Sequence, residues 1–280
     1  MFRCTILFFF LSLTLQAQTS CSLESRQKLE KELTKISTKQ SSDRTIQDLA
    51  VEIGKDFLAT PYVEKTLELP GEEQLVINLM GVDCTTYLET VIALARLAQN
   101  GDYTFQAFEK ELELIRYRRG KNEGYSSRLH YFSDWMYANG EKGLFQDITE
   151  EIGGIPYSNT PSFMSENPQF YPQLADPKNL AAIKVTEAEI GKRNYFFIPK
   201  EKISSLEDSI QSGDIIAITT SIPNLDMVHV GFAFEKNGRI HLMHASSKNA
   251  EVEISQMPLH DYLSGNKSQS GIMVSRLSGQ

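Results

Sequence analysis

Cysteine is scarce in this 280-residue chain, which contains Cys4, Cys21 and Cys84 only. Three thiols are too few for the disulfide framework of a small secreted domain. Long runs of one charge are also missing, and 28 basic against 36 acidic residues give a net charge of −8 at pH 7. Because a chain with this charge repels a phosphate backbone, we expect no nucleic-acid partner.

Long hydrophobic runs are missing after the N-terminus, where residues 6–15 form a mostly apolar stretch. This stretch is too short to cross a bilayer, and the small residue Ala17 follows it where a signal peptidase can cut. We therefore expect a signal peptide over residues 1–17, a secreted or periplasmic protein and no transmembrane segment. Lipid attachment to Cys21 is an alternative, although Gln18 stands where lipoprotein signals usually have an aliphatic residue.

Apolar residues make up 41% of the chain, enough for a packed core. They recur at helical spacing in residues 43–58, 84–100 and 105–118, and we expect a further helix from near Tyr125. Alternation typical of strands follows in residues 214–220, 229–235 and 239–245. Helices first and strands last favour an α+β fold with a C-terminal antiparallel sheet.

Cys84 is the first candidate for chemistry. Asp83 and Cys84 open the most regular helical pattern, and a thiol at a helix start lies near the positive end of the helix dipole. That position favours the thiolate, so we expect a lowered pKa for Cys84. A small buried core residue is the alternative, since it is the common fate of a free cysteine.

Two histidines fall on one face of a predicted hairpin. If Asn237-Gly238 is its two-residue turn, His244 faces Gly231, which leaves space beside the ring, and His229 is the diagonal neighbour of His244. His241 then points to the opposite face. A cysteine with two histidines is the arrangement for nucleophilic catalysis, in which a thiolate needs a base and the base needs an orienting partner.

Zinc is the alternative use of these histidines. A catalytic zinc site needs about three protein ligands on one face, yet His241 points away and the chain has no HExxH motif. Histidines without a shared role are the third interpretation. We expect no metal and no other cofactor.

The ordered motifs resemble those of the NlpC-type papain-like cell-wall amidases, and most of all the N-acetylmuramoyl-L-alanine amidase-like branch. They are TPY at 60–62, DC at 83–84, SRLHY at 127–131, DW at 134–135, GDII at 213–216, HVG at 229–231 and HAS at 244–246. The resemblance covers most of the chain from about residue 43. It implies a papain-like core and a cysteine amidohydrolase that acts on peptidoglycan or muropeptides without a metal.

The resemblance also implies roles for single residues. Cys84 matches the nucleophile, His229 the general base and His244 the polar residue that orients the base. Tyr62 matches a tyrosine that lines the substrate cleft, and the backbone amide of Cys84 would help to form the oxyanion hole. The chain departs from the wider family after the nucleophile, where Thr85-Thr86 replaces Ser-Gly.

Ser127, Arg128 and His130 are the further candidates for substrate binding. Arg128 and His130 are expected on one helix turn, with Arg128 binding a peptide or lactyl carboxylate through its two-pronged guanidinium. An ion pair of Arg128 with Asp134 or a nearby glutamate is the alternative.

Three segments follow from this interpretation. After the signal peptide, residues 18–42 are expected to form an N-terminal helical arm, solvated or loose, and residues 43–280 a papain-like catalytic domain. Its Cys84 and His229 are farther apart in sequence than the compact family core needs, so residues 102–200 are expected to hold a large, mainly helical insertion.

The name of the branch favours cleavage of the bond between N-acetylmuramic acid and L-alanine. The γ-D-glutamyl–diamino acid bond and a non-catalytic muropeptide-binding module are the alternatives.

Overall fold

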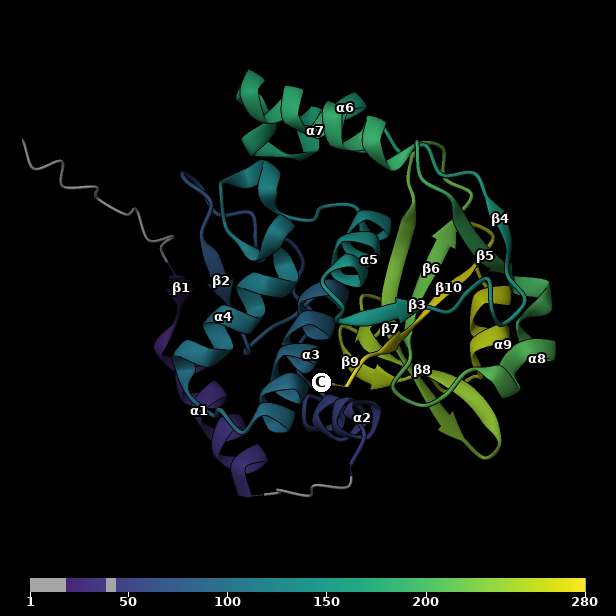
Figure 1. The fold of residues 1–280 in the computed structure, drawn as a ribbon, viewed down its shortest axis with the longest axis horizontal. Coiled ribbons are helices and arrows are strands. Elements are labelled where there is room, and N and C mark those ends of the chain that lie inside the picture. The colour runs from purple at the N-terminus through teal and green to yellow at the C-terminus, as the bar shows by residue number, and fades with distance from the viewer. Residues whose placement is uncertain (1–18, 39–43, 280) are drawn as a thin grey trace, which may run out of the picture.

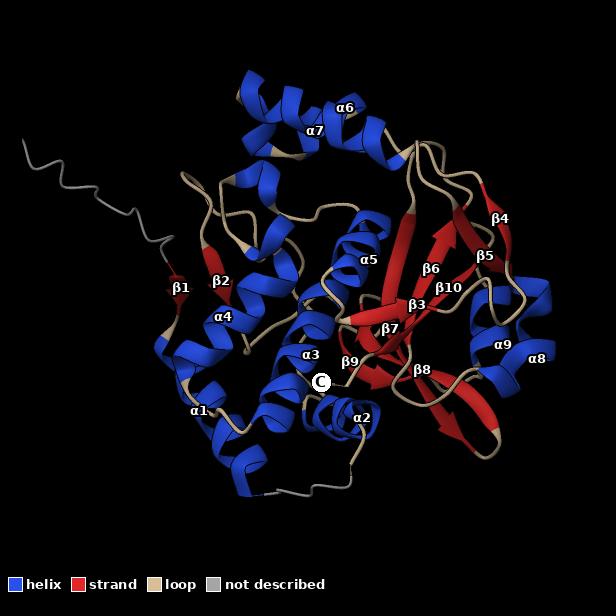
Figure 2. Cartoon of the chain, viewed as in Figure 1, coloured by secondary structure: helices blue, strands red, loops and turns tan. Residues whose placement is uncertain are grey.

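The computed structural model describes residues 19–38 and 44–279, so the predicted signal peptide, residues 1–17, lies outside the described part of the chain. Its helices are α1 (Leu23–Thr38), α2 (Ile46–Asp56), α3 (Cys84–Asn100), α4 (Phe105–Arg116), α5 (Phe132–Glu141), α6 (Phe163–Glu166), α7 (Pro177–Ile190), α8 (Ile203–Leu206) and α9 (Leu259–Ser264). Its strands are β1 (Thr19–Cys21), β2 (Leu75–Ile77), β3 (Phe145–Asp147), β4 (Ile155–Tyr157), β5 (Tyr195–Pro199), β6 (Ile215–Thr220), β7 (Met227–Lys236), β8 (Arg239–Ser246), β9 (Glu251–Ile254) and β10 (Gln269–Leu277). Most helices lie on one side of the sheet (Figure 2). None of the described helices is long and apolar enough to cross a membrane.

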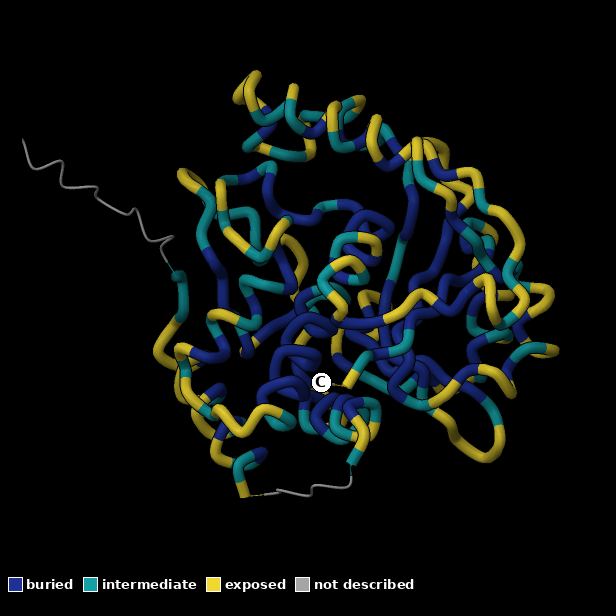
Figure 3. The backbone as a smooth tube through the Cα atoms, in the orientation of Figure 1, coloured by how far each residue is buried: buried dark blue, intermediate teal, exposed yellow. Residues whose placement is uncertain are grey.

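Helix α3 runs through the middle of the molecule and is buried along most of its length (Figure 3). It begins at Cys84 because Asp83 caps it: the Asp83 carboxylate accepts from Thr86 N at 2.7 Å, and Thr86 Oγ1 accepts from Asp83 N at 2.9 Å. It ends at Gly101, whose φ of 71° places it in the left-handed region. The helix predicted over residues 84–100 is therefore confirmed.

The main sheet has the strand order β4-β5-β10-β6-β7-β8-β9, and β3 pairs with β10. The central pairs are antiparallel, as expected for the C-terminal half. Asn237 and Gly238 both have positive φ and form the turn between β7 and β8, in which Phe234 faces His241. This is the predicted hairpin register.

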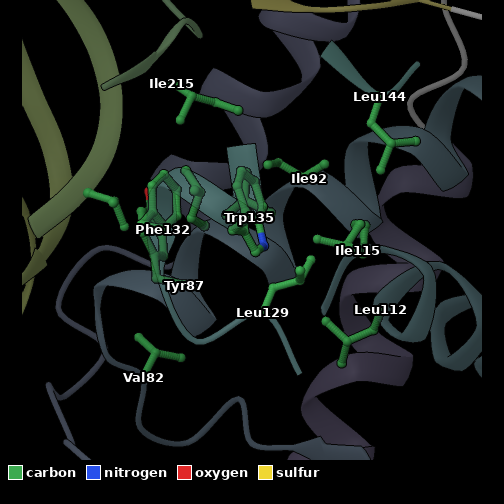
Figure 4. Packing of buried hydrophobic residues seen from close by; sticks show 14 of the residues in the cluster. Val82, Tyr87, Ile92, Leu112, Ile115, Leu129, Phe132, Trp135, Leu144 and Ile215 are labelled. Atoms are coloured by element: carbon green, nitrogen blue, oxygen red, sulfur yellow. The ribbon is translucent and has the colours of Figure 1, made fainter. Parts of the chain in front are cut away.

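Two hydrophobic layers cover the two faces of the sheet. Val230 and Phe232 of β7 belong to the larger core that includes α2 and α3, whereas the neighbouring Ala233 belongs to the smaller core with α8 and α9. Helix α3 lies on one side of the sheet and α9 on the other (Figure 1). In the larger core the indole of Trp135 stacks on Phe132, with ring centroids 4.6 Å apart (Figure 4).

Residues 125–131 are not α-helical, so the helix expected from near Tyr125 begins later than predicted and contains Asp134 and Trp135 but not Arg128. Tyr125–Ser127 form a single 3-10 turn, and α5 begins only at Phe132. The turn closes on itself because Ser127 Oγ donates to Gly124 O at 2.6 Å and Gly124 has a φ of 98°. Arg128 follows in an extended conformation.

Two expected segments are more closely joined to the core than the sequence indicated. In the N-terminal arm, α1 buries Leu29, Leu33 and Ile36 in the larger core, so the described part of the arm is not loose. Residues 102–200 contain α4 to α7 and also supply β3, β4 and β5 to the main sheet.

Candidate active site

A cavity of about 320 Å³ lies where the start of α3 meets the start of β7. Cys84 and His229 line it from these two elements. The segment that contains Arg128 and His130 also lines it, together with Phe170 and other aromatic residues. The fold thus brings two predicted catalytic residues and two predicted binding residues to the wall of one cavity, although they are far apart in sequence.

The surroundings of Cys84 favour the protonated form of its thiol. Burial raises its pKa to about 12, and the neighbouring Asp83 carboxylate contributes to the rise. Hydrogen bonds from the backbone of Val230 and from Thr85 oppose the rise but are outweighed. The expected lowering of the pKa is therefore wrong, because burial destabilises the thiolate by more than the helix start stabilises it.

His229 and His244 are in direct contact, as the predicted hairpin register requires. His229 Nε2 lies 2.5 Å from His244 Nδ1, and the two rings are perpendicular. His241 lies on the other face, where its Nδ1 is 2.7 Å from Ser255 O. The register therefore selects the same pair from the three hairpin histidines that the sequence selected.

Both imidazoles are neutral near pH 7. Burial lowers the pKa of His229 to about 3, with a further contribution from His244, and burial lowers the pKa of His244 to about 4. A neutral imidazole has one nitrogen that donates and one that accepts. Across the 2.5 Å contact one ring must therefore donate and the other accept.

Gly231 allows the two strands to approach closely at His244. A Cβ on Gly231 would lie 2.9 Å from His244 Cβ and 2.8 Å from Met243 O. The expected open space beside His244 is therefore not there. The absence of a side chain on Gly231 instead allows β7 and β8 to lie in close contact.

Tyr62 lies beside the chain that leads into α3. It forms a β-bridge with Val82, and its backbone N donates to Ala250 O at 2.8 Å. Burial, followed by the proximity of Cys84, raises the pKa of the Tyr62 phenol. Tyr62 is thus near the thiol but is not among the residues that line the cavity.

Arg128 is buried and bound to two glutamates from the loop between α2 and β2. Its Nη2 lies 2.6 Å from Glu68 Oε1, and its Nε lies 3.3 Å from Glu73 Oε1. Asp134, the other expected partner, is held by Arg118 and Arg193 instead. The alternative of an ion pair with nearby glutamates is therefore the arrangement present, and it leaves Arg128 less positive charge for a substrate carboxylate.

Ser127 and His130 have different surroundings. The Ser127 hydroxyl donates to Gly124 O and accepts from Glu123 N, so it is occupied within its own turn, and Ser127 does not line the cavity. His130 does line it, with Nε2 2.8 Å from Tyr125 O. Burial and the Arg128 charge keep its pKa well below 6.5, so Nε2 is the protonated nitrogen of a neutral ring.

Asp226 is a cavity residue that the sequence analysis missed. It is buried, and its carboxylate accepts from Ser133 N at 2.8 Å and from Met227 N at 2.7 Å. Burial raises its pKa. Its place shortly before His229 in the chain was the one signal available from the sequence. Its contact with Ser133 could not be predicted, because the two residues are 93 positions apart.

Residues 52–272 match the model of the family described as AmiA-like, N-acetylmuramoyl-L-alanine amidase-like. The chain belongs to this family. A crystal structure of an N-acetylmuramoyl-L-alanine amidase from Bacteroides uniformis is 39% identical, with a TM-score of 0.79 over 84% of this chain and 99% of that one. None of the curated proteins compared with the chain matches it.

Two other solved structures share the fold with this AmiA-like chain. One, from Bacteroides fragilis and provisionally described as a xylanase, is 38% identical, with a TM-score of 0.77 over 81% of this chain and 100% of that one. Another, from Legionella pneumophila, is 24% identical, with a TM-score of 0.69 over 91% and 95% of the two chains. The latter shows likeness of fold alone.

Proposed function

We propose that this AmiA-like protein is a cysteine amidohydrolase with a papain-like, NlpC-type site that cleaves the bond between N-acetylmuramic acid and L-alanine in peptidoglycan or its fragments. The observation that carries the proposal is that Cys84 and His229 line the same cavity and that His229 contacts His244. A nucleophile, a base and a partner for the base are the parts that covalent amide hydrolysis needs.

The reaction starts from a neutral thiol and a neutral imidazole. His229 takes the Cys84 proton as the sulfur attacks the lactyl carbonyl carbon, and the backbone N–H of Cys84 at the start of α3 stabilises the oxyanion. The proton passes from His229 to the nitrogen of L-alanine, which leaves as a free amine. His229 then activates water, which hydrolyses the thioester and restores the thiol.

The carboxylates on the cavity wall support an amidase over a glycosidase. A glycosidase needs a pair of carboxyl groups, one to give a proton and one to act as base or nucleophile. Glu89 is bound to Arg116 and Trp135, and Glu68 is bound to Arg128. Asp83 caps α3 through Thr86 N, and Asp226 already accepts two backbone N–H groups, so each of the four carboxylates that line the cavity is engaged.

We propose secretion or periplasmic export after removal of residues 1–17. Cleavage there keeps β1, in which Thr19 and Ser20 pair with Leu75 and Val76 of β2. Lipid attachment at Cys21 would remove Thr19 and Ser20 and with them most of this pairing.

Mass spectrometry of defined muropeptides incubated with the wild type and with Cys84→Ala tests the proposal. The wild type is expected to release a sugar with a free lactyl carboxylate and a peptide with a free L-alanine amine, and Cys84→Ala is expected to bind without turnover. Release of a peptide that begins with the diamino acid would instead indicate cleavage of the γ-D-glutamyl bond. Binding without cleavage by the wild type would indicate a binding module, and loss of activity with a chelator would indicate a zinc enzyme.

A further inference from the structure

The Nε2 nitrogen of His244 has no hydrogen-bond partner, although the residue is fully buried. Its Nδ1 faces His229, while Nε2 is without a partner within hydrogen-bond distance. A carboxylate oxygen of Glu253 lies 3.7 Å from this Nε2. That separation is too long for a direct hydrogen bond but short enough for strong electrostatic interaction in a buried setting.

Glu253 is held in this place by the sheet and by one side chain. It faces His244 across the β8–β9 pair. Asn249 Nδ2 donates to both of its carboxylate oxygens, each at 2.8 Å. The side chain of Glu253 is only 17% exposed, so solvent screens its charge incompletely.

The carboxylate distinguishes between the two ways in which the histidines can share protons. In the first, His244 carries its proton on Nε2, toward Glu253, and accepts from His229 Nε2, which leaves His229 Nδ1 with a free lone pair. In the second, His244 donates from Nδ1 to His229, and His229 Nδ1 carries a proton. The second arrangement turns the lone pair of His244 toward a negative charge and leaves His229 unable to accept a proton from the thiol.

We propose that Glu253 is a positioning residue, which fixes the proton of His244 on Nε2 and thereby keeps His229 Nδ1 free to act as the base. The proposal rests on the proposed function, because it assigns His229 the role of base. It adds one residue to the contact between His229 and His244.

The other groups that face His244 do not supply this negative charge. They are His229 from β7 and Tyr262 from α9, whose ring centroid is 5.5 Å from that of His244. Burial, followed by Glu253 itself, raises the pKa of the Tyr262 phenol, so the phenol is neutral near pH 7. Among these three groups, Glu253 alone carries a negative charge.

Histidine-ring ¹H–¹⁵N spectra of the full mature chain test the proposal directly. In the wild type we expect both His229 and His244 to be protonated on Nε2. Glu253→Gln presents an amide that offers either an N–H or an oxygen to His244, so the ring signals should show loss of the single tautomer. We expect kcat on muropeptides to fall on the order of tenfold with little change in KM, as for other residues that orient a catalytic imidazole.

Glu251→Gln is the matched control, because it removes the same charge from an exposed position of β9. Its ring spectrum and kcat should equal those of the wild type. The proposal is overturned if Glu253→Gln and Glu253→Ala both keep the wild-type tautomers, or if Glu251→Gln alters them equally. The spectra need no turnover, so an inactive wild type with the expected tautomers would count against the proposed function and not against the role of Glu253.

Discussion

At the scale of single residues, burial moves the pKa values of the thiol and the imidazole in opposite directions. It raises the pKa of Cys84 to about 12 and lowers that of His229 to about 3. Burial thus favours the neutral form of each group. In the proposed mechanism, proton transfer from Cys84 to His229 therefore accompanies the attack on the substrate.

The low pKa of His229 predicts activity that persists in mild acid. A neutral base is lost only as pH falls through its own pKa, so kcat/KM should stay nearly level from pH 7 to about pH 5. Stability behaves differently, because the unfolded chain protonates these histidines near their ordinary pKa of about 6.5, and the melting temperature should fall below that pH. A pH–rate profile with parallel thermal melts checks both, and half-maximal kcat/KM near pH 6.5 would contradict this account of His229.

Prediction from sequence succeeds at this scale where the deciding contacts are local. The Asn237-Gly238 turn fixes which histidines share a face, and its two residues are adjacent in sequence. The partners of Arg128 lie 60 and 55 positions earlier, at Glu68 and Glu73, and no local pattern indicates them. The pKa of Cys84 was mispredicted for the same reason, since desolvation is a property of the tertiary structure.

At the scale of elements, the start of α3 joins helix capping to the chemistry of the thiol. Asp83 caps the helix through its carboxylate and also raises the pKa of Cys84. The extended segment before α5 was mispredicted as helix because its turn depends on Gly124 and the Ser127 hydroxyl, which compete with helical hydrogen bonds.

Asp83→Asn separates the two effects. Asparagine keeps the capping oxygen and removes the charge, so the pKa of Cys84 should fall while stability changes by about 0.5 kcal/mol or less. Asp83→Ala removes both and should cost about 1 kcal/mol. The pH dependence of Cys84 alkylation and urea unfolding measure the two quantities. An unchanged thiol pKa in Asp83→Asn would show that the carboxylate does not act on Cys84.

At the scale of the whole molecule, the N-terminal arm is part of the packed domain. Helix α1 contributes three large apolar side chains to the larger core, and residues 102–200 contribute strands to the main sheet. The sequence indicated the α+β class and the antiparallel sheet because periodicity is a local property. It did not indicate how the arm and the insertion join the core, which depends on contacts between distant segments.

Removing residues 1–42 should therefore destabilise the protein strongly. Loss of Leu29, Leu33 and Ile36 from the core should lower the free energy of unfolding by roughly 5 kcal/mol or more. Within the mature chain, Leu33→Ala should cost about 2–5 kcal/mol, whereas Leu23→Ala, at a position 66% exposed, should cost little. Equal stability of Leu33→Ala and Leu23→Ala in urea unfolding would contradict the packing of α1.

In the proposed reaction, Cys84 attacks the lactyl amide of a muropeptide held in the cavity between α3 and β7. A crystal structure of Cys84→Ala with an uncleaved N-acetylmuramoyl-dipeptide tests it most directly. We expect the lactyl carbonyl carbon beside Cβ of residue 84, its oxygen near the backbone N–H of that residue, and His229 next to the scissile nitrogen. A muropeptide bound with another amide at that place, or bound outside the cavity, would contradict it.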